Sequence, residues 1–262
     1  MKSQLVKAVA WIGPPVLLFL LVVGFWHWRT TAFKVPAYLF PSPGQVCSAA
    51  FENREDLFKG LVITGSAAGL GFLCSLSIGF LVSLAFSQSA LIRRSGYPYA
   101  IFLQTVPIVA IAPLIITWFG YGFRSVVIVS FIIGLFPIIT NTTTGMLAIE
   151  RAHLELFRIY NASRWKILWK LRVPNSVPFL VAGAKTSSGL SVIGAIVGEF
   201  FVGFGSDSHG LGYYITLASG QLKTDMLFAS VLTCTLLGLS VFVIVNVLSL
   251  VVLRRWSTAS RS

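Results

Sequence analysis

Side chains that could carry out chemistry are few in this sequence, and they are widely spaced. The histidines and cysteines form no CxxC or HExxH pattern; they are His27, His153, His209, Cys47, Cys74 and Cys234. A zinc site needs such ligands at short fixed spacings, and a disulfide framework needs paired cysteines. The sequence therefore predicts no metal site, no redox centre and no cofactor bound by this chain. The cysteines are expected to act as small hydrophobic side chains.

Two charges stand out because they interrupt an apolar stretch. Lys185 and Glu199 are fourteen residues apart, which in a helix separates them by about 21 Å along the axis, so they cannot pair with each other. Lys185 is expected to extend its amine toward the inner membrane boundary, and Glu199 to lie near the outer end. For Glu199 two roles stay open: a gate or pathway residue in transport, or an acceptor of structural hydrogen bonds from loop amides.

A third concentration of charge is basic and lies in residues 149–178. Its lysines and arginines alternate with Leu, Ile, Phe and Trp; they are Arg151, Arg158, Arg164, Lys166, Lys170 and Arg172. An amphipathic basic loop between membrane spans is expected at the cytoplasmic face, where it offers a surface to a partner. The alternative is a segment that only binds anionic lipid.

The composition indicates what kind of scaffold must position these groups. Hydrophobic residues make up 56% of the chain, charged residues 11%, and the mean hydropathy is +0.84. These values exclude a soluble globular domain. The net charge of +12 lies mainly beside apolar runs, so we attribute it to membrane topology and anionic lipid rather than to nucleic acid.

Six apolar runs are long enough to cross a bilayer core, which needs roughly 20 helical residues. They are residues 11–28, 60–86, 98–120, 124–146, 179–202 and 226–253. The sequence thus predicts an all-α polytopic membrane protein, with a single transmembrane domain over residues 1–262. The first run resembles a signal peptide, but its length and aromatic end favour an uncleaved signal-anchor over a removed signal.

The distribution of lysine and arginine predicts the orientation of these spans. One side collects thirteen of them, including the six of the basic loop, and the other side collects six, which leaves Lys185 inside a span. Because basic residues accumulate on the cytoplasmic side, both termini and the basic loop are expected in the cytoplasm. The chain is therefore predicted to be a multi-pass protein of the cell inner membrane.

The segment Ala32–Lys59 is expected on the outer side. Its prolines, in VPAYLFPSPGQV, favour an extended path along the surface. After it, Val46–Phe58 is amphipathic enough to form a short interfacial helix. Its acidic residues Glu52, Glu55 and Asp56 form either a solvated face or a docking surface for a protein that delivers the solute.

The third and fourth spans contain interior prolines: Pro98, Pro107, Pro113 and Pro137. Each removes a backbone hydrogen bond, so kinked helices with polar neighbours are expected. Either these prolines shape a hydrated path, or they are packing irregularities. The candidate pathway residues are Gln104, Thr105, Asn141 and Glu199.

The fifth span is rich in small residues. Gly194 and Gly198 are four apart, so they lie on one face of a helix and permit close approach of another helix. We expect this to be a central helix, and its small residues are the predicted seam between two copies of the chain.

The basic loop is predicted to fold as two short helices, Arg151–Tyr160 and Arg164–Leu171. Ser163 is a good N-cap for the second helix, and Pro174 is expected to stop it. Asn161 between them can adopt the left-handed conformation that ends a helix. A helix-turn-helix that projects into the cytoplasm follows.

The spacing within this loop carries a family resemblance. Glu155 precedes Asn161 by six residues, Leu171 follows ten residues later, and Val173-Pro174 completes the pattern. It resembles the EAA signature of ATP-binding-cassette importer permeases, which consists of Glu-Ala-Ala, three residues, Gly, nine residues, Ile, one residue and Leu-Pro.

Other segments extend the resemblance over nearly the whole chain: VPAYLFPSPGQV, TVPIVAIAPLIITWFGYG, FPIITNTTTG, NASRWKILWKLRVPNSVPFLVAGAK, VGEFFVG and GLGYYI. Together they are similar to the nitrate, sulfonate, taurine and pyrimidine-precursor branch of these permeases. Leu156 and Phe157 replace the two alanines of the signature, and Asn161 replaces its glycine. The two bulkier side chains imply a wider docking groove on the partner.

The resemblance implies a type I ABC importer-like fold whose loop docks on a separate ATPase. The coupling residues would be Glu155, Leu156, Phe157, Asn161, Ser163, Arg164, Trp165 and Pro174. It also implies two ATPase copies that bind ATP and magnesium, a periplasmic or lipid-anchored substrate-binding protein, and a homodimer of permeases that works by alternating access. The chain itself would not be an enzyme, since its nearest approach to a phosphate loop, GAKT at residues 183–186, lacks the glycine before the lysine.

The resemblance leaves the solute open among sulfonates, taurine, nitrate and thiamine-precursor pyrimidines. The alternative class is an ion-coupled secondary transporter, but no internal repeat is visible and Glu199 lies far from the midplane. A membrane enzyme is disfavoured because no His, Asp or Ser constellation occurs.

Overall fold

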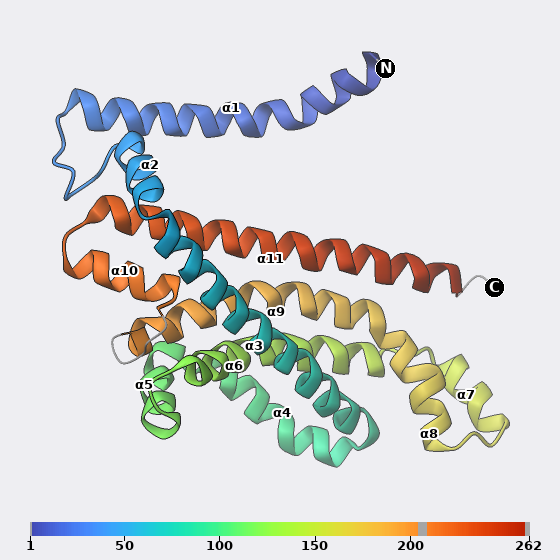
Figure 1. Cartoon of the computed structure of the whole chain (residues 1–262). Coiled ribbons are helices and arrows are strands. Elements are labelled where there is room, and N and C mark those ends of the chain that lie inside the picture. Colours follow the sequence, from blue (N-terminus) through green and yellow to red (C-terminus); the bar gives the residue numbers. More distant parts are fainter. Residues whose placement is uncertain (1, 204–208, 260–262) are drawn as a thin grey trace. The chain divides into compact units, whose positions relative to one another are not determined.

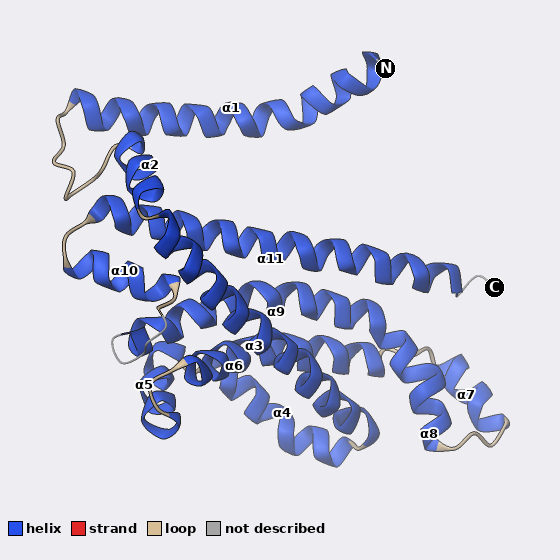
Figure 2. Cartoon of the chain, in the orientation of Figure 1, coloured by secondary structure: helices blue, strands red, loops and turns tan. Residues whose placement is uncertain are grey.

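The computed structural model describes residues 2–203 and 209–259. All regular secondary structure in these residues is helical (Figure 2). The helices, labelled in Figure 1, are α1 (Lys2–Ala32), α2 (Pro43–Glu52), α3 (Arg54–Gln88), α4 (Ala90–Thr105), α5 (Ile108–Phe119), α6 (Phe123–Leu147), α7 (Arg151–Ile159), α8 (Arg164–Ile167), η1 (Leu168–Arg172), α9 (Val173–Val202), α10 (Leu211–Gly220) and α11 (Thr224–Ala259).

Among the described residues, five helical segments are long and apolar enough to cross a membrane: Gly13–Ala32, Arg54–Gln88, Phe123–Leu147, Arg164–Val202 and Thr224–Arg254. The pair α4 and α5 passes the same test if it is counted as one broken span. This set confirms the all-α fold class and the membrane-spanning character predicted from the six apolar runs.

The third predicted span is not a continuous helix, and the prediction of one run over residues 98–120 is wrong in this respect. α4 ends at Thr105, α5 begins at Ile108, and their axes differ by 101°. Val106 has an extended conformation, φ −72° and ψ 126°, because a residue before proline is pushed out of the helical region. Pro107 therefore breaks the span, whereas Pro98 and Pro113 are accommodated inside helices.

The chain divides into two compact parts. The first part comprises residues 1–58 and 214–232. Its connecting segment after α1 is held by hydrogen bonds: Trp26 Nε1 donates to the Pro41 carbonyl at 2.9 Å, and Thr224 Oγ1 donates to the Tyr38 carbonyl at 2.6 Å. The rings of Trp26 and Phe228 lie 5.8 Å apart. The proline-rich segment thus follows a fixed path.

The helix predicted over Val46–Phe58 is two helices. α2 starts three residues earlier, at Pro43, where Ser42 and Gln45 form a reciprocal capping box, a strong start signal. It ends before Asn53, whose Nδ2 donates to the Ala49 carbonyl at 2.8 Å. An asparagine that binds the backbone of the preceding turn competes with helix continuation, so α3 starts afresh at Arg54.

The second part comprises residues 59–213 and 233–262, and α6 is its central helix. Serine hydroxyls bridge from neighbouring helices to backbone carbonyls. Ser75 of α3 donates to Phe131 of α6 at 2.7 Å, and Ser187 of α9 donates to Gly134 of α6 at the same distance. Small side chains permit this close packing, which stabilises helix association where no hydrophobic effect acts between helices.

The small residues of α9 face α6 of the same chain. A Cβ atom on Gly194 would lie 2.7 Å from Ser130 Cα, and one on Gly198 would lie 3.2 Å from Val126 Cα. The expected close approach and the central position of this helix are present. Both glycines pack against α6 of the same chain, and the predicted seam between two copies stays a prediction.

Candidate functional site

The basic loop folds as a helix, a tight turn and a second helix. α7 ends at Ile159, and Asn161 has the predicted left-handed conformation, with φ 48°. Ser163 caps the second helix, since its Oγ accepts from the Lys166 amide at 3.3 Å. For the loop over residues 149–178, the predicted first helix, turn and cap therefore agree with the structure up to Ser163.

The second helix of the loop does not stop at Pro174, and this prediction is wrong. α8, η1 and α9 follow one another without a break from Arg164 to Val202. The wider π turn brings the Val173 amide onto the Leu168 carbonyl, five residues back. In a regular helix the Pro174 ring would clash with the Lys170 carbonyl and leave it without a donor. The π turn accommodates the proline, so the fifth membrane helix starts inside the loop rather than at residue 179.

No residue of α7 or α8 is buried. Apolar and aromatic side chains are nevertheless concentrated there: Leu156 is 49% exposed, Tyr160 78% and Trp165 68%. The sequence-predicted coupling residues Glu155, Asn161, Ser163 and Arg164 are also exposed, while Phe157 and Pro174 are half-buried. We call residues 151–167 the docking loop. Exposed apolar side chains beside basic ones are what the predicted contact with a partner requires.

The base of the docking loop contains a residue that the sequence patterns did not indicate. Asn175 Nδ2 donates to the carbonyls of Gly145, at 2.8 Å, and Ala148, at 3.1 Å. It thereby ties the end of α6 to the start of α9. A cavity of about 360 Å³ lies beside it, lined in part by Glu150, His153 and Lys170. No local sequence signal marks Asn175, because the carbonyls that it binds lie 30 and 27 residues earlier in the chain.

Glu199 lies at the other end of the helical segment that begins in the docking loop. Its carboxylate accepts hydrogen bonds from Thr64 Oγ1, at 2.8 and 2.9 Å to the two oxygens, and from the Gly212 amide at 2.8 Å. Thr64 Oγ1 in turn accepts from the Leu211 amide at 2.9 Å. We call these four residues the Glu199 network. Of the two open roles for Glu199, the contact expected of the structural one is present.

The break between α4 and α5 lies beside a cavity of about 360 Å³. Most of its lining is apolar, from α4, α5, α6 and α9; the polar side chains are Gln104 and Thr105. Asn141 is not among the lining residues; its Nδ2 donates to the Pro137 carbonyl at 2.8 Å. The structure thus brings together only the first two of the four candidate pathway residues.

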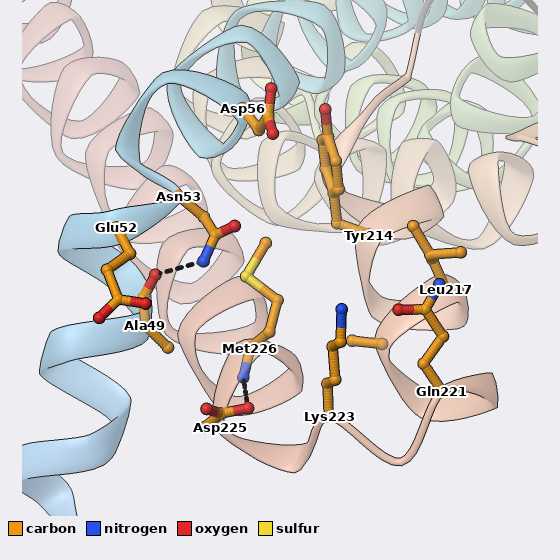
Figure 3. Close-up of a pocket in the computed structure, with 11 residues that line it drawn as sticks. Ala49, Glu52, Asn53, Asp56, Tyr214, Leu217, Gln221, Lys223, Asp225 and Met226 are labelled. Carbon is orange, nitrogen blue, oxygen red and sulfur yellow. Dashed lines mark hydrogen bonds between the residues drawn. The ribbon is translucent and has the colours of Figure 1, made fainter.

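The first part of the chain contains a recess of about 400 Å³ (Figure 3). Its lining is Ala49, Glu52, Asn53, Asp56, Tyr214, Leu217, Ala218, Gln221, Lys223, Asp225 and Met226. Figure 3 shows Asp56 and Lys223 on opposite sides of this space. Two of the three acidic residues singled out in the sequence line it, and Glu55 does not. Asp225 and Tyr214 were missed, because no local pattern connects them with residues over 150 positions earlier.

Within the second part, the docking loop and the end of α11 lie at one end (Figure 1). The start of α4, the helix that contains the Arg93–Arg94 pair, lies at that end too, whereas the C-terminal end of α9 lies at the opposite end. Most basic groups of this part therefore share one end, as the charge distribution predicts.

Comparison with protein families shows a match over residues 71–258 to the model described as "Binding-protein-dependent transport system inner membrane component". The chain is similar to the riboflavin transport system permease protein RibX of Chloroflexus aurantiacus, with 34% identity over 93% of this chain and 90% of that one. It is also similar to the formylaminopyrimidine transport permease protein ThiX of Halalkalibacterium halodurans, with 32% identity over 91% of this chain and 94% of that one.

A solved structure shares the fold. The permease of the methionine ABC transporter MetNI, in an inward-facing crystal form, superposes with a TM-score of 0.52 at 17% identity, over 73% of this chain and 93% of that one. At this identity the likeness concerns the fold alone.

Proposed function

Because this chain belongs to the family of binding-protein-dependent transport system inner membrane components, we propose that it takes a small solute from a substrate-binding protein and passes it into the cytoplasm by alternating access. The chain is a membrane-spanning permease subunit of an ABC importer. This membership confirms the family indicated by the spacing from Glu155 to Pro174. ATP hydrolysis belongs to separate ATPase subunits, which hold the nucleotide and magnesium.

The observation that carries the proposal is the docking loop. It exposes Leu156, Tyr160 and Trp165 as well as the acidic Glu155, and no residue of α7 or α8 is fully buried within the chain. Aromatic residues at the centre of an interface contribute most to binding energy. An ATPase cleft would cover them, with room for Leu156 and Phe157 where the family signature has alanines.

The docking loop is also suited to transmit movement. α8 continues through η1 into α9 without a break, so a displacement imposed on the loop acts directly on a membrane helix. Rigid-body rocking of helices around a central site is the form of alternating access that this connection supports. Two ATPases require two docking loops, so the working unit is a pair of permeases, most simply a homodimer.

The orientation follows from charge. The docking loop and both termini lie in the cytoplasm, since basic residues concentrate there. The recess lined by Glu52, Asp56 and Asp225 then belongs to the outer side, where a substrate-binding protein docks. With three carboxylates against Lys223, it favours a basic side chain on that protein.

The solute is best described as uncharged and ring-bearing. The cavity beside the α4–α5 break offers an amide, a hydroxyl and apolar walls, and none of its lining residues is charged. A pocket of this composition suits an aromatic heterocycle better than a sulfonate or nitrate, which would require a fixed positive group. The relatives named for formylaminopyrimidine and riboflavin are 32% and 34% identical, and those named for aliphatic sulfonates 26% and 27%.

The test is uptake by the reconstituted importer, with the permease, its ATPase and its substrate-binding protein in proteoliposomes. Glu155→Lys should abolish ATP-driven uptake and ATPase co-purification while the protein still inserts in the membrane. Lys59→Glu, on the opposite side, reverses a charge as a control and should retain ATPase binding. Normal uptake by the Glu155 variant would contradict the proposal, as would uptake driven by a proton gradient without ATP.

A further inference from the structure

The Glu199 network joins three helices at the end of α9 that lies far from the docking loop. Resting on the function proposed above, we infer that Glu199 is a positioning residue that transmits movement of α9 to α3 and to the start of α10. The permease would then open or close its outer side through this contact.

The connection from the docking loop to Glu199 is direct. Helical residues run without a break from Arg164 to Val202. At 1.5 Å per residue, Arg164 and Glu199 are roughly 50 Å apart along this segment. One helical element therefore carries the ATPase-facing surface at one end and the Glu199 carboxylate at the other.

The hydrogen bonds of the network leave its members little freedom. The Thr64 hydroxyl donates its only hydrogen to Glu199 and accepts from the Leu211 amide. Gly212 donates its amide to the same carboxylate. Glu199 is only 4% exposed and Thr64 is fully buried, so each lost bond would leave a buried polar group without its partner, which is energetically costly. Relative movement at this point is thus disfavoured.

The packing around the network is equally close. A Cβ atom on Gly210 would overlap the Glu199 carboxylate, and one on Gly212 would lie 2.5 Å from the Ile196 carbonyl oxygen. The start of α10 therefore lies directly against the backbone of α9 and the Glu199 side chain. Because there is no slack between them, a shift of α9 must displace the start of α10.

The choice of a carboxylate supports a role beyond space filling. A buried charge in a membrane helix is costly, and a leucine or methionine would fill the same volume without that cost. What an aliphatic side chain lacks is directional bonding to two other helices. The network provides that bonding, to Thr64 of α3 and to Gly212 of α10.

The experiment uses the complete importer in proteoliposomes and measures three quantities: basal ATP hydrolysis, its stimulation by the loaded substrate-binding protein, and solute uptake per ATP hydrolysed. Thr64→Val removes the hydroxyl at nearly constant volume. We expect basal hydrolysis to stay unchanged, while stimulation and uptake per ATP fall by about fivefold or more, the usual size of a coupling between sites. Glu199→Gln should act in the same direction.

Two controls separate transmission from general damage. Thr64→Ser restores the hydroxyl and should restore uptake per ATP. Ser187→Ala removes an equally buried bond between α9 and α6 and should leave uptake per ATP unchanged. The inference is overturned if Thr64→Val keeps wild-type stimulation and uptake per ATP, or if it lowers basal and stimulated hydrolysis by the same factor. If the wild-type importer itself shows no ATP-driven uptake, the proposed function fails instead.

Discussion

The two ends of the helical segment Arg164–Val202 are opposite in character. At the docking loop, apolar side chains such as Trp165 are exposed and no residue of α7 or α8 is buried. At the far end, the carboxylate of Glu199 is buried and hydrogen-bonded by Thr64 and Gly212. An exposed apolar group and a buried charge both need a partner, but the first must find it in another molecule and the second within its own chain. The docking loop is therefore a surface for assembly with another molecule, whereas the Glu199 end is a contact between helices of the same chain.

The largest effect is expected at the exposed end. Trp165→Glu places a charge at an exposed position on α8 of the docking loop, where it would be buried against the ATPase. We expect ATPase affinity to fall by about 2 kcal/mol or more, which is roughly 30-fold. Thermal stability of the isolated permease should stay unchanged, because Trp165 contacts little of its own chain. Pull-down of the ATPase on immobilised permease measures the first effect. Loss of permease stability in this variant would show that the loop is internally packed.

A substitution between the two ends should affect folding instead of assembly. Gly194→Val forces a side chain against the Ser130 backbone, because the added Cβ atom would lie 2.7 Å from Ser130 Cα. Such overpacking typically costs about 1–3 kcal/mol. A lowered melting temperature of the detergent-solubilised protein is the expected result. Gly189→Val serves as the control, since nothing lies within 4 Å of its Cβ position. Equal destabilisation by both variants would contradict the assigned packing.

A smaller effect is expected where the loop joins the membrane helix. Pro174→Ala supplies an amide hydrogen and removes the ring, so η1 can close as regular α turns. We expect ATPase affinity to fall by about 1 kcal/mol, a typical single-substitution effect, with little loss of stability. Hydrogen exchange of residues 168–174 and the pull-down assay measure the two consequences. Unchanged affinity together with a remodelled turn would show that the winding of η1 does not matter for docking.

The smallest effect concerns an exposed acid, in contrast to the buried Glu199. Asp56→Asn should slow association of the substrate-binding protein a few-fold at low salt and hardly at all at high salt, because exposed charges act over about 10 Å at 0.1 M salt and are screened beyond that distance. Glu55→Gln, outside the recess, is the control. A salt-independent loss would mean that Asp56 is desolvated on docking.

Local signals in the sequence predicted much of this structure. The predicted N-cap at Ser163 and the predicted left-handed conformation of Asn161 are confirmed, because a cap and a left-handed turn depend only on atoms of neighbouring residues. The apolar runs predicted the membrane helices because the length and hydropathy of a span are also properties of one continuous segment. Pro107 and Pro174 illustrate the limit, since the first breaks its span by 101° and the second is absorbed in a π turn. The outcome depends on whether tertiary contacts favour a continuous or a broken helix, which a single sequence does not show.

The candidate site was predictable to a lesser degree. The docking loop follows from its spacing, whereas the Glu199 network needs Thr64, which lies 135 residues away in sequence. The recess that includes Asp225 also arises from distant segments. Gly194 shows a related limit: a small residue predicts that a helix approaches closely, but not whether this helix belongs to the same chain.

The π turn at Leu168–Arg172 has an angular consequence. A π turn contains about one residue more than an α turn, which corresponds to about 100° of helical rotation. If this segment were a regular α-helix continuous with α9, α8 would expose a different face. The π turn rotates the exposed face of α8 by this angle. Removing a single residue from η1 would rotate α8, and Trp165 with it, to a different direction about the helix axis while leaving the membrane helix in place. In this permease, the direction in which the docking loop faces is set by the winding of five residues.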